Sequence, residues 1–346
     1  MAELWYCLDQ LPDLTLNKYA SLEGSGVDGV IQKHIAFLRQ LNRKGIVSGL
    51  SFHLFYLYTQ PEEPALDRPG QRLKIFLLVR GRDDALRNVP ALIKASPLWE
   101  FYPFRGQQAP DDAGQADVPP ASLRGYLAER GLSEPVFPVC CALTKSETLL
   151  PSENGESGGY YMIRDWEMNE DGRLYNMCTM MEALGKTALY RVDLYPVERS
   201  AALREALRKP MSILRKRQDE RAGGRRDYDG KDVLDSYDNL IEKFDSSPHF
   251  IANIFVLAGS HEDAASILDA AGAESLMKGK YTVATFSAPA EGFRPLSFLD
   301  GIAQPLENLR EHMVMRTGKP GLIVCREDTA NLLSLIHISE PTRRVV

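Results

Sequence analysis

A short pattern occurs twice in this sequence, and it constrains the fold more than any other feature does. The segment "IFLLVRGRDDA" (75–85) aligns without a gap with "IFVLAGSHEDA" (254–264). Each copy has the pattern of an apolar strand, a short polar turn and an acidic helix start. Self-similarity of this kind predicts two related units. Any strand that enters an acid-capped helix has a similar pattern, so chance resemblance remains the alternative.

Alternating apolar residues predict further strands on both sides of each copy. The expected strands are "LSFHLFYLY" (50–58), "RLKIFLLVR" (72–80), "TALYRVDLY" (187–195), "FIANIFVLAG" (250–259) and "KYTVATF" (280–286). Helical spacing predicts helices over 28–45, closed by Gly45, over 83–96, kinked or restarted at Pro90, and over 262–273. "FPVCCALT" (137–144) is expected to be a buried strand.

These elements predict an α+β fold, built from two related units of mixed or antiparallel sheet with helices packed on one face. We expect an N-terminal domain over 1–165 with a polar linker near 104–120, and a second domain over 166–332. The second domain is predicted to carry a basic helical insertion near 199–231.

The balance of charge limits the functional classes. The chain has 346 residues and a net charge of −6, so nucleic-acid binding over the whole surface is excluded and only a local basic face remains. We find no apolar run long enough to cross a bilayer and no signal-peptide pattern, which predicts a cytoplasmic protein. Its five cysteines form no C-x-x-C pair and are expected to be reduced thiols packed in the core.

Three short motifs suggest nucleotide or acyl chemistry, and none has the required context. "GSGVDG" (24–29) lacks a preceding apolar strand, so a turn with Asp28 as a helix cap is preferred over a dinucleotide site. "GKT" (185–187) runs from helix to strand, the reverse of a phosphate-binding loop, and Gly185 is expected to cap a helix. "GESGG" around Ser157 is expected to be a loop. We therefore predict no catalytic, cofactor-binding or metal-binding residue.

The strongest charge feature is a basic stripe in the expected insertion. Basic residues greatly outnumber acids between residues 204 and 226. Such a stripe could contact a phosphate backbone or an acidic protein surface, whereas a solvated helix face is the plain alternative. The candidate contact residues are Arg208, Lys209, Arg215, Lys216, Arg217, Arg221, Arg225 and Arg226.

The last residues have an unusual origin in this interpretation. Leu333 to Arg343 can be written as one reading frame of a transposase adaptor used in sequencing libraries, so 333–346 is interpreted as an adaptor-derived tail. The alternative is a natural strand, "LSLIHI", followed by a basic tail. The first interpretation predicts that the chain is a fragment with its true C-terminus elsewhere.

The order of several segments resembles the front half of a large HerA/FtsK-type P-loop ATPase, the group that includes conjugative and type IV secretion ATPases. The segments are the strand pair at 50–80, "IKASPLWEFYPF", "LYNMCTMMEALGKTALYRVDLYPVE" and "HFIANIFVLAGSHEDAASILDA". The resemblance lies in arrangement rather than in a signature motif. It implies a non-catalytic region for assembly and partner docking, with the phosphate-binding loop downstream of residue 332.

This resemblance implies a cytoplasmic front region of a ring-forming motor that moves DNA or protein. The chain itself would have no ATPase activity, and ATP and magnesium would bind only to the missing C-terminal part. The full-length protein would be a homo-oligomer. Two alternatives stay open: a free-standing interaction adaptor, and a dinucleotide-dependent enzyme built on Gly24 to Gly29, which is less favoured.

Overall fold

The computed structural model describes the following parts of the chain. They are residues 2–8, 26–60, 73–96, 104–106, 122–129, 137–145, 148–150, 160–162, 175–197, 249–275, 281–286 and 323–324. Single positions are also described at 131, 135, 208, 212, 215, 216, 219, 231, 234, 235 and 238. The structural statements below concern these residues.

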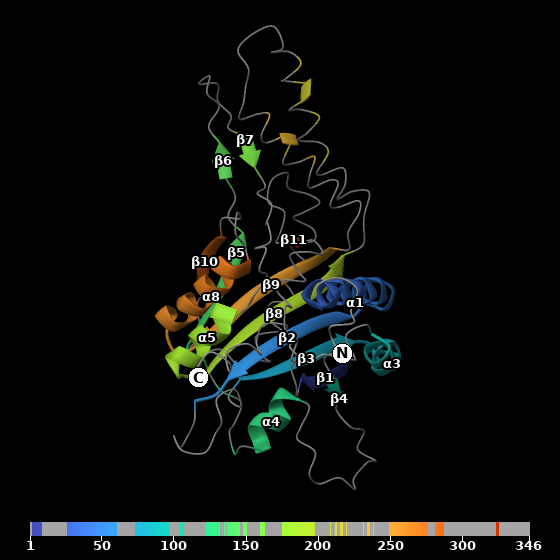
Figure 1. Ribbon diagram of the computed structural model, residues 1–346, viewed down its shortest axis with the longest axis vertical. Helices are drawn as coiled ribbons and strands as arrows, with labels where there is room; N and C mark the ends of the chain where they lie inside the picture. The colour runs from blue at the N-terminus through green and yellow to red at the C-terminus, as the bar shows by residue number, and fades with distance from the viewer. Residues whose placement is uncertain are drawn as a thin grey trace.

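The described strands form one nine-stranded sheet, in which every neighbouring pair is antiparallel (Figure 1). Its order is β10-β5-β9-β8-β2-β3-β1-β4, and β11 also pairs with β9. The strands are β1 (Ala2–Leu8), β2 (Ser51–Tyr58), β3 (Leu73–Gly81), β4 (Phe104–Gly106), β5 (Val139–Lys145), β8 (Ala188–Val197), β9 (His249–Ala258), β10 (Tyr281–Phe286) and β11 (Ile323–Val324). A separate hairpin pairs β6 (Thr148–Leu150) with β7 (Tyr160–Met162).

The strand order is symmetric about the β2–β8 pair, as the predicted duplication requires. The first half contains the elements β1, α1 (Gly26–Ser48), β2, β3, α2 (Asp83–Leu86), α3 (Val89–Lys94) and β4, with sheet order 4-1-3-2. The second half contains β5, α5 (Tyr175–Leu184), β8, β9, α8 (His261–Ser275) and β10, and it has the same order. This is the βαββαβ arrangement called split βαβ or ferredoxin-like. We call the two halves unit 1 and unit 2.

The register of the strands supports the same correspondence. In each unit, one residue of the repeated pattern, one of the first strand and one of the last strand lie in a single row across the sheet. The rows are Ile75–Leu8–Phe104 in unit 1 and Ile254–Leu143–Val283 in unit 2. Phe104 lies as far along the chain from Ile75 as Val283 does from Ile254. The repeated pattern and the last strand are therefore separated by the same number of residues in the two units.

Helices cover both faces of the sheet. The helices of the two units lie on the same face, as predicted, over a core that includes Leu38 and Leu41 of α1 and Ile267 and Leu268 of α8. In Figure 1, α1 and α3 lie over the unit 1 strands, and α5 and α8 lie over the unit 2 strands. The opposite face carries α4 (Leu123–Glu129), which lies between the units in sequence and was not predicted. Its buried residues Leu123, Tyr126 and Leu127 pack with Phe55, Phe76 and Leu257.

Several helix boundaries differ from the sequence-based expectation. α1 begins at Gly26, so Asp28 lies inside the first turn and is not the cap. The helix continues past Gly45 to Ser48, and Gly49 ends it with a φ of 63°. The Leu50 amide donates to the Gly45 carbonyl at 3.0 Å, which is the long hydrogen bond of a Schellman C-cap. Gly45 instead allows close packing, because a Cβ there would clash with Pro196 of β8.

The restart at Pro90 is confirmed, because α2 ends at Leu86 and α3 begins at Val89 with the proline in its first turn. The predicted polar linker near 104–120 begins with the strand β4. Residues 107–120 lie outside the described residues. β5 was expected in the first domain, but it pairs with β9 and β10 in unit 2. The adaptor-like tail at 333–346 lies outside the described residues.

Candidate functional site

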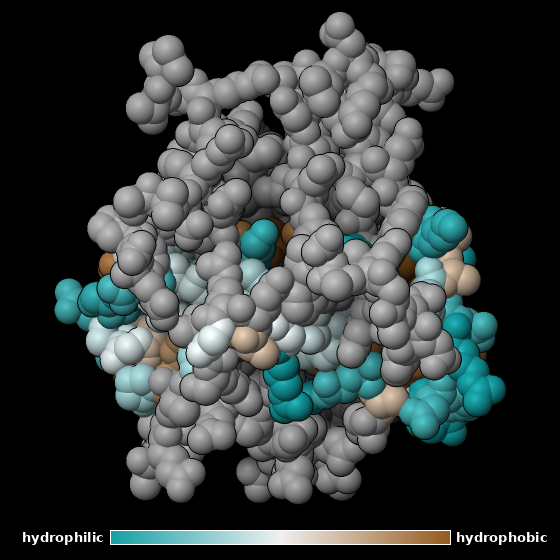
Figure 2. Space-filling view, turned by 90° about the horizontal axis from the view of Figure 1, so that it is seen from below, coloured by the Kyte–Doolittle hydropathy of each residue, from teal (hydrophilic) through white to brown (hydrophobic). Residues whose placement is uncertain are grey.

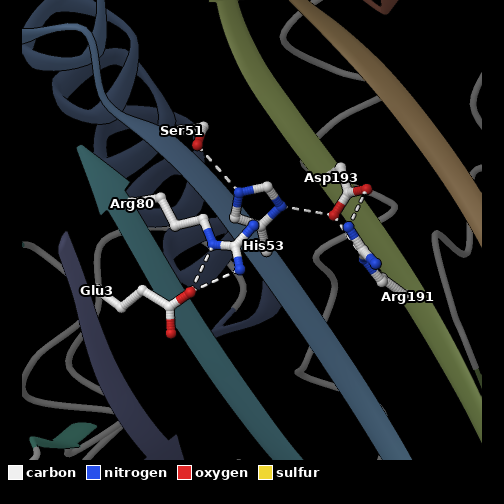
Figure 3. A network of polar contacts seen from close by, with 6 residues as sticks. All are labelled: Glu3, Ser51, His53, Arg80, Arg191 and Asp193. Atoms are coloured by element: carbon white, nitrogen blue, oxygen red, sulfur yellow. Dashed lines mark hydrogen bonds and ion pairs between the residues drawn. The ribbon is translucent and has the colours of Figure 1, made fainter. Parts of the chain in front are cut away.

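A polar network crosses the junction of the two units on the α4 face of the sheet (Figure 3). Ser51 and His53 come from β2, whereas Arg191 and Asp193 come from β8. Side chains two residues apart on a strand share a face, so these four side chains face the same side as Phe55 and Leu189. The strand register places His53 directly opposite Asp193.

The central contacts are short and buried. His53 Nδ1 lies 2.6 Å from Asp193 Oδ1, and His53 Nε2 lies 3.0 Å from the Ser51 hydroxyl. Arg191 binds both carboxylate oxygens of Asp193, from Nε at 2.8 Å and from Nη2 at 2.7 Å. The side chains of Arg191 and Asp193 have no exposed surface, and that of His53 is 1% exposed. Such a forked, charge-assisted pair fixes both side chains.

Electrostatics sets the protonation states of this network. Burial lowers the pKa of His53 below its ordinary value, against the opposing influence of Asp193. Burial alone would raise the pKa of Asp193, but Arg191 and His53 hold it at about 2. The carboxylate can only accept hydrogen bonds, so Nδ1 of the neutral imidazole donates to it. Nε2 then accepts the hydrogen bond from the Ser51 hydroxyl.

A second ion pair extends the network into β1 and β3. Arg80 donates to Glu3 Oε1 from Nε at 2.9 Å and from Nη2 at 2.6 Å. Arg80 is also the direct neighbour of Ser51 in the β2–β3 register. Two guanidinium groups and two carboxylates therefore lie on one face around a neutral histidine, and their charges cancel.

The order Ser51–His53–Asp193 is that of a catalytic triad, in which a histidine activates a serine and an aspartate orients the histidine. Two features of this site favour a connecting role. Arg191 uses both oxygens of Asp193, and the His53–Asp193 pair lies where β2 of unit 1 meets β8 of unit 2. We call Ser51, His53, Arg191 and Asp193 the junction network.

Sequence reasoning missed this network, because its partners are far apart in the chain. The Ser51 contact of His53 is local in sequence, but its Asp193 contact spans 140 residues. A signal was nevertheless present. "SFHLFYLY" and "YRVDLY" each place polar residues at alternate positions of an otherwise apolar strand.

Each residue of the "GKT" segment contacts another residue of the chain. Gly185 follows α5 with a φ of 62°, and its amide donates to the Glu182 carbonyl, which confirms the predicted C-cap. Lys186 Nζ lies 3.0 and 3.1 Å from the two oxygens of Asp263, at the start of α8. The Thr187 hydroxyl accepts from the Gln60 amide at 3.1 Å. Ser260 and Lys186 lower the pKa of Asp263.

The other motifs are only partly visible. Gly26 and Gly29 of "GSGVDG" lie in the first turn of α1, whereas "GESGG" lies outside the described residues. Cys7, Cys140, Cys141 and Cys178 are buried and form no disulfide, as predicted, and Cys325 lies outside the described residues. Burial raises the pKa of Cys140 to about 12, so its thiol stays protonated at neutral pH.

Three of the eight predicted contact residues lie among the described positions. Arg208, Arg215 and Lys216 are helical and exposed, and Arg215 Nη2 lies 2.8 Å from Asp238 Oδ1. The other five, Lys209, Arg217, Arg221, Arg225 and Arg226, lie outside the described residues. The visible part of the basic stripe is therefore paired, at one position at least, with an acidic helical residue of the same chain.

The described residues contain no group of three or more His, Cys, Asp or Glu side chains placed to hold a metal ion. None of the described helices has both the length and the apolar composition needed to span a bilayer. Seen from below, the described residues form a band with hydrophilic side chains at both ends (Figure 2). A comparison with known protein families and with curated proteins finds no match to this sequence.

Proposed function

We propose that this chain is a non-catalytic assembly and docking region. The observation that carries the proposal is that the connection between the second and third strands is much longer in unit 2 than in unit 1. In unit 1 the second and third strands are connected by residues 59–72, whereas unit 2 has residues 198–248 in the same place. In repeat proteins, insertions in individual repeats gather on one face, which is often the binding face.

Both long insertions of unit 2 leave the sheet at the same end. Residues 146–174 follow the C-terminal end of β5, and residues 198–248 follow the C-terminal end of β8. β5 and β8 flank β9 on either side, so the two insertions start close together. Figure 1 shows β6, β7 and the described helical positions of 208–238 together above this end of the sheet. Binding residues are commonly carried by such loops on a rigid scaffold.

A docking role also accounts for the junction network, because its charged groups bind one another rather than a substrate. A non-catalytic Ser51 should not react with a fluorophosphonate probe, which labels activated serines by losing fluoride. The measurement is the intact mass of the protein after incubation with the probe, compared with the Ser51→Ala variant. Stoichiometric labelling that requires Ser51 and His53 would overturn the non-catalytic part of the proposal.

For the parent protein, we propose a ring-forming, cytoplasmic translocation ATPase of the HerA/FtsK type, with this chain as its front region. The resemblance in segment order supports this context. ATP and magnesium would then bind only to the part after residue 332, and the assembled protein would be a homo-oligomer that moves DNA or protein.

The test of this context is to sequence the source DNA across the codons for Thr329 to Leu333 and beyond. A frame that continues into a strand followed by G-x-x-x-x-G-K-[ST] supports the motor. An early stop codon removes the motor and leaves a free-standing interaction adaptor, with the docking role unchanged.

A further inference from the structure

The outer side of α1 carries positive charge and no negative charge. Residues 29–48 of the helix contain no Asp or Glu. Arg39 and Arg43 are exposed and four residues apart, so their side chains lie on one side of the helix. Lys44, the next residue, is partly exposed. Leu38 of the same helix is buried in the core, and the two arginines face away from the sheet.

Two further cations lie on the other helices of unit 1. Arg87 lies between α2 and α3, Lys94 is the last residue of α3, and both are exposed. α3 contains no acidic residue. In Figure 1, α1 and α3 lie over the same half of the sheet, and α8 lies over the other half. We call Arg39, Arg43, Lys44, Arg87 and Lys94 the basic face.

The basic face is not neutralised by carboxylates of its own chain. Within the part of the chain that the structure describes, none of its five cations forms an ion pair. The two acids of α2 lie at the start of that helix, and one of them, Asp84, pairs with Arg82 at 3.3 Å. The cations of the basic face can therefore bind an anionic partner without breaking an ion pair first.

Unit 2 shows that the fold does not require these cations. The glycines that follow α1 and α5, Gly49 and Gly185, have the same left-handed backbone conformation. Six residues before the glycine, α1 has Arg43 whereas α5 has Thr179, which is also exposed. The sequence of α5 includes no Lys or Arg. Packing of the helix on the sheet therefore does not explain the charge of α1, whereas binding of an anionic partner does.

Unit 2 presents the opposite charge on its longest helix. Glu262 and Asp269 of α8 are exposed, and α8 contains no Lys or Arg. The chain as a whole has a net charge of −6, so a large anion is repelled by the protein at long range and attracted only where cations gather. The difference between the two units therefore directs such an anion to unit 1.

The exposed residues around the basic face favour a phosphate backbone over a protein surface. Protein interfaces have an apolar centre that is enriched in aromatic residues. Among the described residues, Val47 is the one large hydrophobic side chain that is exposed. Phosphate contacts need no apolar centre, because the release of counterions drives them. Single strands also stack their bases on aromatic side chains, and no described exposed residue of α1, α2 or α3 is aromatic.

We propose that the basic face binds the phosphate backbone of double-stranded DNA without reading its sequence. The face offers charge alone, which is sufficient for the phosphates of DNA, whereas recognition of duplex RNA adds contacts to 2′-hydroxyl groups. None of the five cations belongs to the insertions of unit 2. The inference therefore goes beyond the docking role proposed for those insertions, and it holds whether or not a motor follows residue 332.

The experiment measures binding of the whole chain to a short labelled DNA duplex by fluorescence anisotropy, at a series of salt concentrations. If each of the five cations neutralises one phosphate, the logarithm of the association constant should fall with the logarithm of the salt concentration, with a slope of about −4.5. Arg39→Gln/Arg43→Gln should make this slope less negative by about 2 and weaken binding roughly 60-fold at about 0.1 M salt. The loss should be the same for duplexes of different sequence. Absence of binding by the wild type at low salt overturns the proposal.

The matched control is Arg215→Gln/Lys216→Gln, which removes the same charge from exposed positions of the insertion. It should leave the affinity and the slope close to those of the wild type. A loss in the control that equals the loss in Arg39→Gln/Arg43→Gln overturns the assignment to the basic face. Equal affinity for duplex RNA overturns the choice of DNA. Retention on phosphatidylserine vesicles without DNA binding overturns it in favour of a membrane surface.

An added cation gives an independent result, because it tests for a gain of binding. Val47 lies one turn after Arg43 on the same side of α1, and it is 83% exposed. Val47→Lys should tighten binding by about 8-fold at about 0.1 M salt and make the slope more negative by about 1. Ala183→Lys is the matched control, because Ala183 is exposed at the equivalent position of α5, two residues before Gly185. Equal gains at the two positions would show only general charge attraction and would overturn the proposal.

Discussion

Asp193 lies buried between His53, on a strand of unit 1, and Arg191, on its own strand. Burial of a carboxylate is costly unless hydrogen bonds and opposite charges replace the lost water. Arg191 supplies two such bonds and His53 supplies a third. The stability of the β2–β8 junction therefore depends on a carboxylate that binds both the buried guanidinium of Arg191 and the imidazole of His53.

Replacement of Asp193 by Asn should lower the free energy of unfolding by about 3–5 kcal/mol, because it breaks a buried, doubly hydrogen-bonded ion pair with Arg191. The measurement is urea-induced unfolding followed by circular dichroism. Asp84→Asn is the matched control, since Asp84 is 67% exposed and pairs with an exposed Arg82. The control should change stability by no more than about 0.5 kcal/mol. Equal effects of the two substitutions would contradict a structural role for the junction network.

His53 makes stability depend on pH in a defined direction. Its pKa in the folded protein is lower than the ordinary value near 6.5. Below about pH 6.5 the unfolded chain therefore binds a proton that the folded protein does not, and stability falls as the pH falls. The pKa of Asp193 is also depressed, and its contribution is lost only when the pH falls below about 4.

The melting temperature should accordingly fall between pH 7 and pH 5, and His53→Gln should reduce this dependence. The measurement is the difference in melting temperature between the two pH values, in wild type and variant. Identical pH dependence in the two proteins would show that another group causes it.

At the scale of elements, the two units use the same helix ending. Gly49 follows α1 and Gly185 follows α5, with φ values of 63° and 62°, each shortly before the strand of its unit that forms the junction. A Cβ at either position would meet no atom within 4 Å. The glycine is therefore required by backbone conformation and not by space.

Gly49→Ala and Gly185→Ala should each destabilise the protein by about 1–2 kcal/mol, the cost of a left-handed alanine. Gly259→Ala is the control, because a Cβ there is equally free of contacts and no left-handed φ is required. Chemical denaturation of the three variants provides the measurement. If the loss in Gly259→Ala matched the other two, the cause would not be the backbone angle.

Local sequence patterns predicted most helices and strands of both units. The missed strands are those that are defined by pairing with residues far away in the sequence. β2, β3, β8, β9, α8 and β10 alternate or repeat with clear periods, and all of them except β10 have buried apolar residues, as expected. β1 was missed, although Trp5 and Cys7 are buried, because it is defined by pairing with β3 and β4. β4 is only three residues long and begins a polar segment.

The junction network could not be derived for a related reason. A one-residue change in the β2–β8 register would turn His53 away from Asp193, and no local pattern fixes that register. The basic stripe was identified from sequence, but the pairing of Arg215 with Asp238 joins positions 23 residues apart and could not be read from a local pattern. Composition indicates charges, whereas only the fold determines which of them meet.

At the scale of the whole molecule, the two units share one continuous core. The cluster on the α1 face includes Tyr56 of unit 1 and Tyr190 of unit 2, whose rings are 5.6 Å apart. α1 of unit 1 also packs against Pro196 of unit 2 through Gly45. Neither unit has a core that ends at the boundary, so the two should unfold together.

Phe76→Ala in β3 and Leu257→Ala in β9 should each lower the stability of the entire sheet, by about 3–5 and 2–5 kcal/mol. Both side chains are fully buried. The measurement is native-state hydrogen exchange at amides of β1 and β10, on opposite sides of the sheet. Val47→Ala, at an exposed position, is the control. Loss of protection in only the mutated half would show that the units unfold independently.

The identity of the strands that meet at the junction has a consequence for symmetry. Each unit contributes the same strand of its own fold, and the two run antiparallel, which is the geometry of a twofold pair of identical chains. A single unit that formed a twofold pair through this strand would therefore build the same sheet from two molecules. Within one chain the two strands can differ in sequence, so β2 carries His53 and β8 carries Asp193.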